Sequence, residues 1–583
     1  MTRATLIRAL ALTTAIVVAA TAGSIFIGFS EVGGLNALDV LRAVLIVISG
    51  FWLVWGSAAG LMGLFVPSRK PAANPAEPPR GMTVILVPIY NEDPVMTFSR
   101  IAAMNRSLKG LGIADKFHIA ILSDTTSLEI AAQEAVWYEQ LLREPDSAGR
   151  IFYRRREKNT GKKAGNIEDF VLRSGGAYDY AIILDADSLM EGATMAEMAR
   201  RMDAEPDLGL LQTVPQIINA RSFFGRSIQF SAAYLSPVFA RGAALMQGNE
   251  GPYWGHNAIL RMSAFAANCG LPVLSGPPPY GGHILSHDYV EAALLSRAGW
   301  KVTLDPHLGG SYEEGPENLI EYAKRDRRWC QGNLQHRRLI LASGLKFWSR
   351  FTFVQGIMAY MASPLWLLLL AASIGSAMIP EPRIFMRISD AGMLGLAIGV
   401  ALVLVLPKVL ILARGAFDGT NKRFGGFWRA AASICAEIVF STLLAPVLLM
   451  FQSRSVAQVL LGLDGGWPAQ SRSESWLDLR DAFAASWWIA AIGVLTLGAT
   501  LVFAAHITVW VAPAMLPAIF APVLISVSSH VSDKKTKLFF TAPSELAPSP
   551  VILEQKRIHA GWTAEVPAMP AETSVRAQIH VPA

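Results

Sequence analysis

The sequence predicts a Rossmann-like α/β domain inserted into a polytopic α-helical membrane domain, and three observations predict it. Of the 583 residues, 52% are hydrophobic and only 16% are charged, whereas soluble domains carry about 25% charged residues. The apolar excess is gathered in long runs near the two ends of the chain. Between these runs, short apolar segments alternate with helical patterns, which is typical of a mostly parallel sheet with crossover helices.

The apolar runs are long enough to span a membrane, because about 20 apolar residues cross the hydrocarbon layer. They occupy residues 10–29, 43–66, 353–378, 392–413 and 431–450, and a longer tract occupies 484–527. The long tract is about twice one span and contains Pro513 and Pro517, so we expect two passes there. The first run has an alternative interpretation as a signal peptide, although its apolar core exceeds the usual ~7–15 residues.

Clusters of positive charge predict how these passes are oriented, because Lys and Arg are enriched in cytoplasmic loops. Three clusters follow predicted passes, namely Arg69, Lys70 and Arg80; Arg414, Lys422, Arg423 and Arg429; and Lys534, Lys535 and Lys537. They assign the middle of the chain and both ends of the membrane domain to the cytoplasm. Seven passes cannot satisfy this assignment, so we expect two short passes or a re-entrant piece within 431–463.

These boundaries divide the chain into five parts. They are two N-terminal transmembrane helices (1–66), a proline-rich linker (67–80), a cytoplasmic α/β domain (81–347), five to six further passes with interfacial segments (348–530) and a cytoplasmic tail (531–583). The tail is rich in Pro and Ala, and we expect it to be disordered. The three cysteines are far apart and form no CxxC pair, which excludes a disulfide framework and a thiolate metal site.

The predicted strands bring distinctive residues to one edge of the sheet, because ligands of parallel sheets bind at the carboxyl ends of the strands. Strands are expected at 83–89, 117–122, 151–153 and 180–184, with helices at 94–110, 126–144 and 164–173. The motifs that follow the strands are Val87-Pro-Ile-Tyr-Asn-Glu92, then Ser123-Asp124, then Gly161-Lys-Lys-Ala-Gly-Asn166 after a loop, and Asp185-Ala-Asp187.

Carboxylates beside lysines at one edge indicate a divalent cation that bridges a diphosphate. Mg²⁺ or Mn²⁺ prefers oxygen ligands and usually takes few protein carboxylates beside phosphate oxygens. Each feature alone has an ordinary interpretation. An Asp-x-Asp pair occurs in many loops, Asp124 is suited to cap the helix that follows, and paired lysines usually form a solvated face. Their placement at successive strand ends favours the functional interpretation.

Two later motifs add candidates. His287 and Asp288 come directly before an apolar helical run, where Asp288 is either a helix N-cap or a general base that accepts a proton from a sugar hydroxyl. The stretch Arg325-Asp-Arg-Arg-Trp329 lies about twenty residues before the third predicted pass. Arginines bind phosphate bidentately and an indole offers a flat face to a sugar ring, while the alternative is an interfacial helix with an aromatic anchor.

Together these motifs resemble the D, D, D, Q(Q/R)xRW pattern of processive family 2 glycosyltransferases, which include cellulose and hyaluronan synthases. The most similar family is glucan biosynthesis glucosyltransferase H, which makes the backbone of osmoregulated periplasmic glucans. The stretches that carry this resemblance are Tyr253-Trp-Gly-His-Asn-Ala258, Ser286-His-Asp288 and Arg325-Asp-Arg-Arg-Trp-Cys-Gln-Gly-Asn-Leu-Gln-His336. It extends from about residue 79 to 544. Arg325 replaces the Gln of cellulose synthases, and the segment before the first pass is shorter than in many members.

The resemblance implies a GT-A type catalytic domain and a role for each matching residue. Nucleotide-sugar binding is assigned to Ile89, Tyr90, Glu92, Asp124, Lys163, Asn166, Asp185, Arg325 and Arg328. The catalytic residues are Asp288 as base, Asp187, Arg328 and Trp329, and the metal ligands are Asp185 and Asp187. Acceptor contacts are assigned to Gln212, Gln216, His256, Asn257 and Trp329. One base and one metal imply a single displacement with inversion.

The expected function is processive transfer of glucose from UDP-glucose to a growing glucan, which then crosses the bilayer of the bacterial inner membrane. The family resemblance also implies acyl carrier protein and a periplasmic glucan-processing protein as partners, and no nucleic acid. One alternative is a non-processive transferase with a lipid acceptor, which would usually lack the Arg-Arg-Trp element. A second alternative is a transporter or receptor that merely binds nucleotides. The presence of a candidate base, Asp288, beside the candidate metal ligands argues against this alternative.

Overall fold

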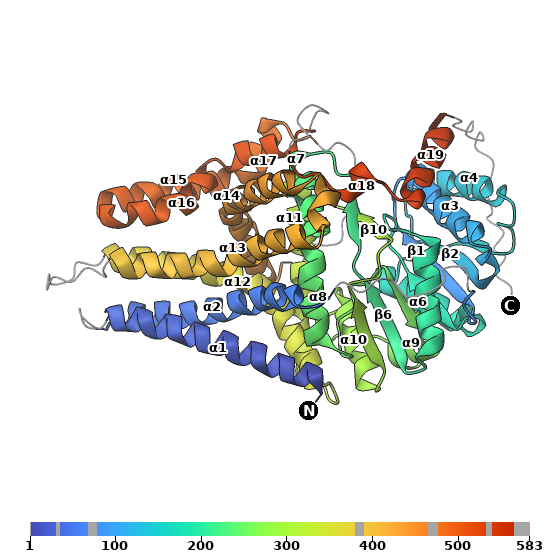
Figure 1. Cartoon of the computed structure of the whole chain (residues 1–583), viewed down its shortest axis with the longest axis horizontal. Helices are drawn as coiled ribbons and strands as arrows, with labels where there is room; N and C mark the ends of the chain where they lie inside the picture. The colour runs from blue at the N-terminus through green and yellow to red at the C-terminus, as the bar shows by residue number, and fades with distance from the viewer. Residues whose placement is uncertain are drawn as a thin grey trace.

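The computed structural model describes residues 2–30, 35–67, 78–378, 390–463, 476–531 and 539–564. An α/β domain forms one end of the molecule and a bundle of long helices forms the other (Figure 1). The predicted insertion of an α/β domain into a helical membrane domain is therefore confirmed. Most of the predicted linker, residues 68–77, lies outside the described residues, as do Lys534, Lys535 and Lys537.

The main sheet has seven strands in the order β3-β2-β1-β4-β8-β6-β9. Its strands are β1 Thr83–Ile89, β2 Phe117–Ser123, β3 Ile151–Arg155, β4 Tyr180–Ile183, β6 Leu208–Thr213, β8 Ala258–Arg261 and β9 Lys301–Asp305. The first four run parallel, as predicted, and β8 runs antiparallel to both of its neighbours. The apolar side chains on both faces of β1 are buried, because helices cover the sheet on each side.

The three helices expected at 94–110, 126–144 and 164–173 begin and end within two residues of the observed α3 Pro94–Gly110, α4 Leu128–Leu142 and α5 Lys162–Ser174. The further helices of the domain are α6 Gly192–Ala204, α7 Phe223–Tyr234, α8 Ser236–Gln247, α9 Met262–Asn268, α10 His287–Arg297 and α11 Leu319–Gln335. A second sheet, which the sequence did not predict, consists of β5 Leu189–Met190, β10 Ser311–Glu314 and β7 Gln216–Ile218. It brings residues from three distant segments beside the carboxyl ends of the main strands.

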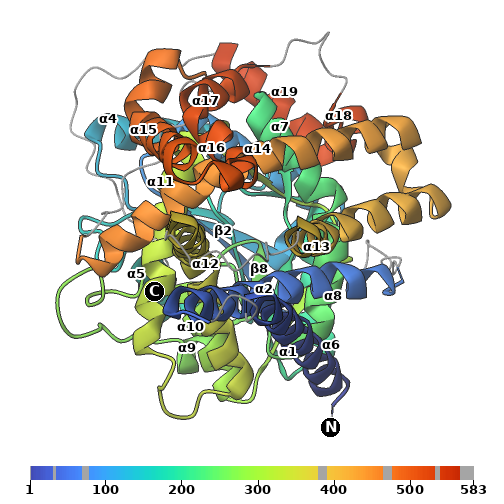
Figure 2. The same ribbon diagram turned by 90° about the vertical axis from the view of Figure 1, so that its left-hand side faces the viewer.

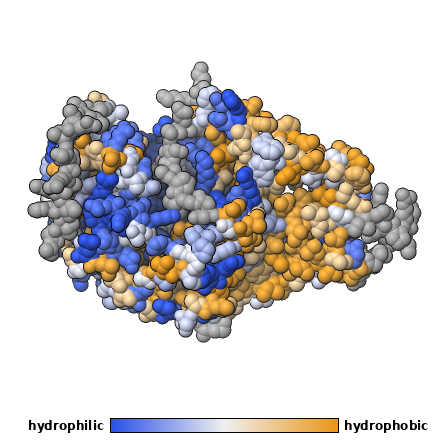
Figure 3. Space-filling model, turned by 180° about the vertical axis from the view of Figure 1, so that it is seen from behind, coloured by the Kyte–Doolittle hydropathy of each residue, from blue (hydrophilic) through white to orange (hydrophobic). Residues whose placement is uncertain are grey.

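Among the described residues, six helices are long and apolar enough to cross a membrane, and a seventh candidate is a pair of helices bent by 52°. The long helices are α1 Arg3–Ser30, α2 Ala37–Leu64, α12 Phe347–Met378, α13 Asp390–Phe417, α14 Phe427–Leu460 and α15 Leu479–Phe503. The first member of the bent pair is Ala505–Ile519, which includes α16 Thr508–Ile519, and the second is α17 Ala521–Ser529. Apolar surface covers this end of the molecule, whereas hydrophilic surface gathers over the α/β domain (Figure 3).

Both ends of α14 contact the α/β side of the structure. Before its start, Asn421 accepts a hydrogen bond from Tyr234 of α7. Beyond its end, the carbonyl of Leu463 accepts a 2.8 Å hydrogen bond from Arg327 of α11. In Figure 2, α14 runs across the view while α12 and α13 are seen nearly end-on. The contacts therefore place α14 along the boundary between the two halves of the molecule.

The position of α14 corrects the expectation for residues 431–463. This segment forms neither two short passes nor a re-entrant piece, because one helix runs unbroken from Phe427 to Leu460. With α14 at the boundary and the bent pair counted as one pass, the remaining candidates among the described residues are even in number. An even number of passes leaves both ends of the membrane domain on the same side.

The predicted disorder of the tail is wrong for its first part. Helix α19 (Pro550–Ala564) packs on α3, with the Trp562 ring stacked on Trp137 at a centroid distance of 5.1 Å. Arg106 of α3 pairs with Glu554 at 2.7 Å. A buried indole and an ion pair give this segment the contacts that its Pro- and Ala-rich composition did not suggest. Residues 565–583 lie outside the described part of the chain.

A close crossing of α2 and α8 joins the membrane helices to the α/β domain. A Cβ on Gly63 would lie 1.8 Å from the carbonyl oxygen of Val238, and a Cβ on Gly242 would lie 1.8 Å from that of Ala59. Only glycine permits two backbones to approach this closely. The chain continues from α8 into the loop that carries residues 248–257, so this crossing positions that loop.

We expect Gly242→Val to destabilise the protein, because the new side chain would force α2 and α8 apart at a cost of about 1–3 kcal/mol. Gly399→Val is the matched control, since Gly399 lies in α13 and has no atom within 4 Å of its Cβ position. Thermal unfolding of the two purified variants in detergent gives the comparison. Equal melting temperatures for both variants would contradict the close crossing.

Candidate active site

The carboxyl ends of the parallel strands converge as the sequence predicted. The amide of Asp124, just after β2, donates a 2.9 Å hydrogen bond to the carbonyl of Ile89 at the end of β1. Asp185 follows β4, which pairs with β1 on its other side. Three predicted site residues therefore lie at one edge of the sheet.

The side of the edge near β1 and β2 holds Tyr90, Glu92 and Asp124. The Glu92 carboxylate accepts a hydrogen bond from the Tyr90 amide. Arg156 donates to both oxygens of Asp124, from Nε at 2.7 Å and from Nη2 at 2.8 Å. Asp124 does not cap the next helix, because Ser127 occupies the N-cap of α4. Ile89 itself is buried and exposes only 4% of its surface.

A turn with left-handed backbone brings Lys163 to the carboxylates. Gly161 has a φ of 70° and Lys162 a φ of 54°. After this turn, the Lys163 ammonium donates to Asp185 and, at 2.7 Å, to the carbonyl of Gly255. Arg156 also donates to the carbonyl of Lys162 at 3.1 Å. The lysine loop is thereby tied to Asp124 as well as to Asp185.

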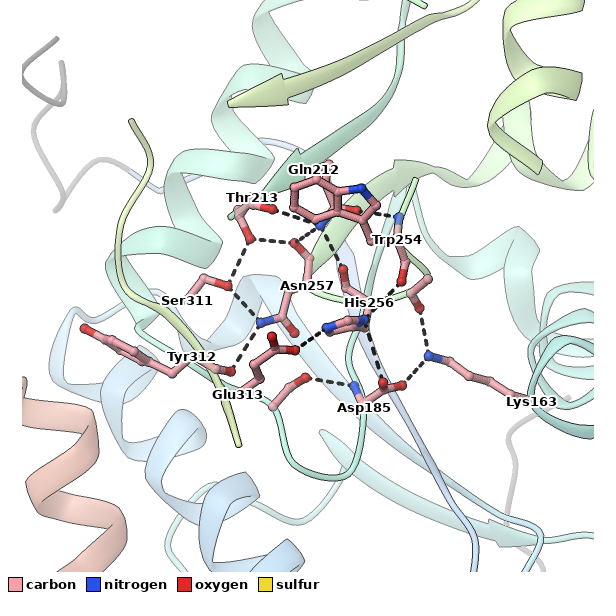
Figure 4. Close-up of polar contacts among 12 residues, drawn as sticks. Lys163, Asp185, Gln212, Thr213, Trp254, His256, Asn257, Ser311, Tyr312 and Glu313 are labelled. Atoms are coloured by element: carbon pink, nitrogen blue, oxygen red, sulfur yellow. Dashed lines mark hydrogen bonds and ion pairs between the residues drawn. The ribbon is translucent and has the colours of Figure 1, made fainter. Parts of the chain in front are cut away.

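His256 lies between two carboxylates that come from different sheets (Figure 4). Its Nε2 donates to Glu313 of β10 at 2.7 Å, and its Nδ1 lies 3.7 Å from Asp185. Burial disfavours a charged imidazole, but Asp185 and Glu313 outweigh it and raise the pKa of His256 to about 9. Burial likewise opposes ionisation of Asp185, yet Lys163 and His256 hold the pKa of that carboxyl well below its usual range.

Asp288 lies beside Gly255, whose carbonyl binds Lys163. A Cβ on Gly255 would lie 3.6 Å from Oδ2 of Asp288, while the Gly255 carbonyl accepts from Lys163. Ser286 occupies the N-cap of α10 and Asp288 lies in the first turn, so Asp288 is not the cap. Burial raises the pKa of Asp288 and Glu291 adds to this effect, against the opposing charge of His287. A raised pKa suits a carboxylate that accepts a proton.

Helix α11 carries the predicted Arg-Arg-Trp element. The Arg325 guanidinium lies over the Trp329 ring, 4.6 Å from its centroid, and Trp329 remains 41% exposed. Burial and the neighbouring Arg325 lower the pKa of Arg328. The arginines therefore form a concentrated positive charge beside an available aromatic face.

The end of α11 grips the loop that precedes Asp288. The Gln335 amide donates to the carbonyl of His283 at 3.2 Å and accepts from the amide of Leu285 at 3.0 Å. Burial lowers the pKa of His336 to about 4, so its neutral ring donates from Nε2 to the Ser286 carbonyl at 2.9 Å. Asp288 and the Arg-Arg-Trp element are thus held in one rigid arrangement.

The predicted acceptor residues differ in how far they are exposed to solvent. Gln212 is fully buried, and its amide donates to the carbonyl of His256 at 2.9 Å and accepts from the amide of Trp254 at 3.0 Å. Asn257 is also buried and donates to Ser311 at 2.8 Å. Both hold the loop that carries His256. Gln216 lies half-buried on β7 opposite Tyr312.

One predicted nucleotide residue lies behind the site. Asn166 is fully buried, where its amide donates to the carbonyl of Leu122 at 3.0 Å and accepts from Arg154 at 2.5 Å. These bonds hold the first turn of α5 against the sheet. Its part in the site is to support Lys163, three residues earlier.

A cavity of about 350 Å³ lies between this site and the membrane helices. Its walls come from α2, α8 and α12 and from the loop before His256, and they include Trp55, Gln247, Trp254, Trp348 and Gln355. The volume falls within the range of about 300–1,000 Å³ that is usual for small-molecule sites. Indole faces and amides are groups that bind sugar rings.

The donors at the edge fit a divalent cation of the Mg²⁺ type. Asp185 and Asp187 are two residues apart in one loop, and Asp187 exposes only 6% of its surface. Among the described residues, no group of three or more His, Cys, Asp or Glu side chains could hold a metal ion. Two carboxylates match a cation that takes its remaining ligands from water and phosphate oxygens.

Four residues of this arrangement had no predicted role, namely Arg156, Glu313, Gln335 and His336. Arg156 directly follows β3, so the rule that identified Asp124 could have identified it. Gln335 and His336 stand within the quoted motif of α11, but only their contacts reveal what they hold. No sequence signal pointed to Glu313, because its strand has four residues.

Comparisons with known proteins agree with this geometry. Residues 84–268 match the model of glycosyl transferase family 2, and residues 180–379 match glycosyl transferase family group 2. A glucans biosynthesis glucosyltransferase H from Cereibacter sphaeroides is 53% identical over 94% of each chain. A protein of that name from Vibrio cholerae is 38% identical over 90% of this chain and 76% of its own length.

Caulobacter vibrioides has a protein of the same name that is 38% identical, over 89% of this chain and 82% of its own length. Among solved structures, a mannosyltransferase from Pyrobaculum calidifontis in complex with GDP-Man and Mn²⁺ aligns with a TM-score of 0.43 at 16% identity. That alignment covers 63% of this chain and 92% of the mannosyltransferase.

We expect Gly332→Ala to loosen the loop before Asp288. A Cβ on Gly332 would lie 2.8 Å from the amide nitrogen of Ser286, so the loop must shift at a cost of about 1–3 kcal/mol. Hydrogen exchange of residues 281–286 should rise in this variant and stay unchanged in Gly270→Ala, whose Cβ position is open. Unchanged exchange in Gly332→Ala would contradict the grip of α11 on this loop.

Proposed function

Because the chain belongs to the glucans biosynthesis glucosyltransferase H family of family 2 glycosyltransferases, we propose that it is a processive, inverting glucosyltransferase. It uses UDP-glucose to extend the linear β-glucan backbone of osmoregulated periplasmic glucans. The catalytic domain faces the cytoplasm and the product crosses the bacterial inner membrane. Acyl carrier protein and a periplasmic glucan-processing protein are not part of this proposal.

The observation that carries the proposal is that Asp288 and the Lys163–Asp185 pair lie beside the same residue, Gly255. A base, a lysine and a carboxylate at one point suit the transfer of a sugar from a diphosphate. Asp288 removes the proton from the acceptor hydroxyl while that oxygen forms the new bond to C1 of glucose. The bond from C1 to the diphosphate breaks on the opposite side, which inverts the configuration.

Cationic side chains stabilise the charge that develops on the leaving UDP. Lys163 of α5 donates to Asp185, and the positive charge of Arg325 on α11 helps to lower the pKa of that carboxyl. Arg328 follows about one helical turn after Arg325. A divalent cation bound by Asp185 and Asp187 would neutralise part of the diphosphate charge. Tyr90, Glu92 and Asp124 line the side of the edge where the uridine is expected.

The exposed face of Trp329 suits stacking against the acceptor sugar. The cavity between α2, α8 and α12 supports a path for the glucan, since Trp254 at its wall is two residues from His256. Cytoplasmic placement of the catalytic domain is supported by Arg414, Lys422 and Arg423, which lie on the α/β side of the helices. A lipid-linked single sugar remains the competing product.

The test is the size of the product that purified protein makes from labelled UDP-glucose in detergent or vesicles. A water-soluble polymer supports the proposal. A single labelled sugar extracted with lipid would replace it with a non-processive transferase. No incorporation from any nucleotide sugar would favour a protein that only binds nucleotides.

We expect Asp288→Asn to reduce polymer synthesis by about 100-fold or more, because the amide keeps the size of the carboxylate but accepts no proton. Binding of UDP should change little, since Asp288 is assigned to the acceptor side. Initial rates and calorimetric UDP affinity measure the two effects. Near-normal synthesis would remove Asp288 from the role of base, and lost UDP affinity would move it to the nucleotide site.

A chelator should abolish turnover, and added Mg²⁺ or Mn²⁺ should restore it. Asp187→Ala should remove activity without unfolding the protein, which circular dichroism and thermal unfolding check. Asp207→Ala is the control, because it removes an exposed carboxylate that pairs with Lys301 outside the site. Full activity in excess EDTA would rule out the metal role of Asp185 and Asp187.

A further inference from the structure

Glu313 extends from β10 of the second sheet toward the loop before β8 (Figure 4). Its carboxylate accepts a 2.7 Å hydrogen bond from Nε2 of His256. Successive side chains of a strand point to opposite faces, and the next residue, Glu314, pairs instead with Arg100 at 2.8 Å. The side chains of Glu313 and His256 expose only 17% and 13% of their surface, so water competes little for their bond. Glu313 thus joins the second sheet to the candidate site.

His256 belongs to a closed circuit of contacts around Asp185. Its Nδ1 lies 3.7 Å from the Asp185 carboxylate. The carbonyl of the preceding residue, Gly255, accepts a 2.7 Å hydrogen bond from Lys163. Lys163 closes the circuit by donating to Asp185. Since Gly255 and His256 are adjacent in the chain, a movement of His256 shifts the Gly255 carbonyl and the ammonium that it binds.

The loop that carries His256 has an unfavourable backbone. Asn257 has a φ of 51°. Left-handed backbone is uncommon for a residue with a side chain, so neighbouring bonds must hold it. Gln212 donates to the carbonyl of His256 at 2.9 Å, and Thr213 donates to the carbonyl of Asn257 at 2.7 Å. These bonds hold the main chain, whereas Glu313 holds the ring of His256.

A second contact of the ring cannot replace Glu313. Nδ1 of His256 lies 3.1 Å from the carbonyl oxygen of Trp254, but Trp254 belongs to the same loop and moves with it. Glu313 belongs to a separate sheet, in which β10 pairs with β5 and β7. A bond between separate elements fixes their relative position, which a bond within one loop does not.

We propose that Glu313 is a positioning residue that acts through His256. It holds the loop so that the Gly255 carbonyl places the Lys163 ammonium against the diphosphate of the donor. This role rests on the proposed function, which assigns Lys163 to the diphosphate. The second sheet then takes part on both sides of the reaction, because Gln216, assigned to the acceptor, lies on β7 beside β10.

The experiment compares Glu313→Ala with Glu313→Gln in the purified full-length protein. Gln keeps an oxygen that accepts from Nε2 of His256, whereas Ala removes it. Asp203→Ala is the matched control, since it also removes a hydrogen-bonded carboxylate. Asp203 accepts from the Tyr180 hydroxyl at 2.9 Å and from the Arg80 amide at 2.7 Å, at the opposite end of the sheet. Calorimetry with UDP and with uridine separates the diphosphate from the nucleoside.

For Glu313→Ala we expect the affinity for UDP to fall about ten-fold, because Lys163 loses a charged hydrogen bond to phosphate. The affinity for uridine, which has no phosphate, should change less than about two-fold. The kcat of chain extension should fall about ten- to a hundred-fold, since a misplaced ammonium loses its orientation. Glu313→Gln should stay within about three-fold of the native protein in each quantity. Asp203→Ala should match the native protein in all three, even with a lower melting temperature.

Hydrogen exchange of residues 253–257 reports the order of the loop whatever the donor sugar is. It should rise in Glu313→Ala and stay native in Glu313→Gln and Asp203→Ala. A double variant tests the route, because Glu313→Ala should add little to the effect of His256→Ala if Glu313 acts through that ring. Additive losses would overturn the proposal.

Native UDP affinity with native loop exchange in Glu313→Ala would also overturn it. Equal losses of UDP and uridine affinity would do the same, since Glu313 would then support the whole site rather than Lys163. Equal losses in Glu313→Gln and Glu313→Ala would show that the hydrogen bond is not what matters. If the native protein neither binds UDP nor uses UDP-glucose, the proposed function fails, while exchange of residues 253–257 still decides whether Glu313 holds the loop.

Discussion

The crowding of carboxylates at one edge of the sheet is the constraint on which the rest of the structure depends. Asp185, Glu313 and Asp288 converge there from a strand end, a second sheet and a helix start. Like charges this close are stable only with cations between them. Lys163 and His256 provide those cations from separate segments, so neutralising the edge also determines where α5 and the loop after α8 must lie.

The membrane helices take part in this arrangement. Helix α8 crosses α2 through paired glycines and continues toward His256, while α11 rests on α12 and on the boundary helix α14. Lys408 of α13 is also bound to α14, through Glu437 at 2.6 Å. The catalytic groups are therefore set by two layers, a sheet that gathers the acids and a helical platform that carries the arginines.

Sequence patterns predicted the part of the fold in which apolar strands alternate with helices along the chain. The strands β1 to β4 and the helices α3 to α5 follow from alternating apolar segments, and their ends supplied Asp124, Asp185 and Lys163. The second sheet was not predicted, because its strands have only two to four residues and pair with strands that are distant in the sequence. Hydropathy could not tell that α14 runs along the boundary, since a lipid-facing stripe and a span have similar composition. The complete burial of Gln212 and Asn166 likewise depends on how the elements pack, which a sequence motif does not reveal.

The grip of α11 on the loop before Asp288 has a consequence for how such proteins diverge. Gln335 and His336 hold backbone atoms of residues 281–286, and Gly332 leaves room for Ser286. A loop of different length would lose both anchors at once, and an altered α11 would release the loop. The two segments are more than forty residues apart in sequence, yet they must be inherited as a pair. Recombination between relatives that differ in the length of this loop would separate the loop from the α11 residues that hold it.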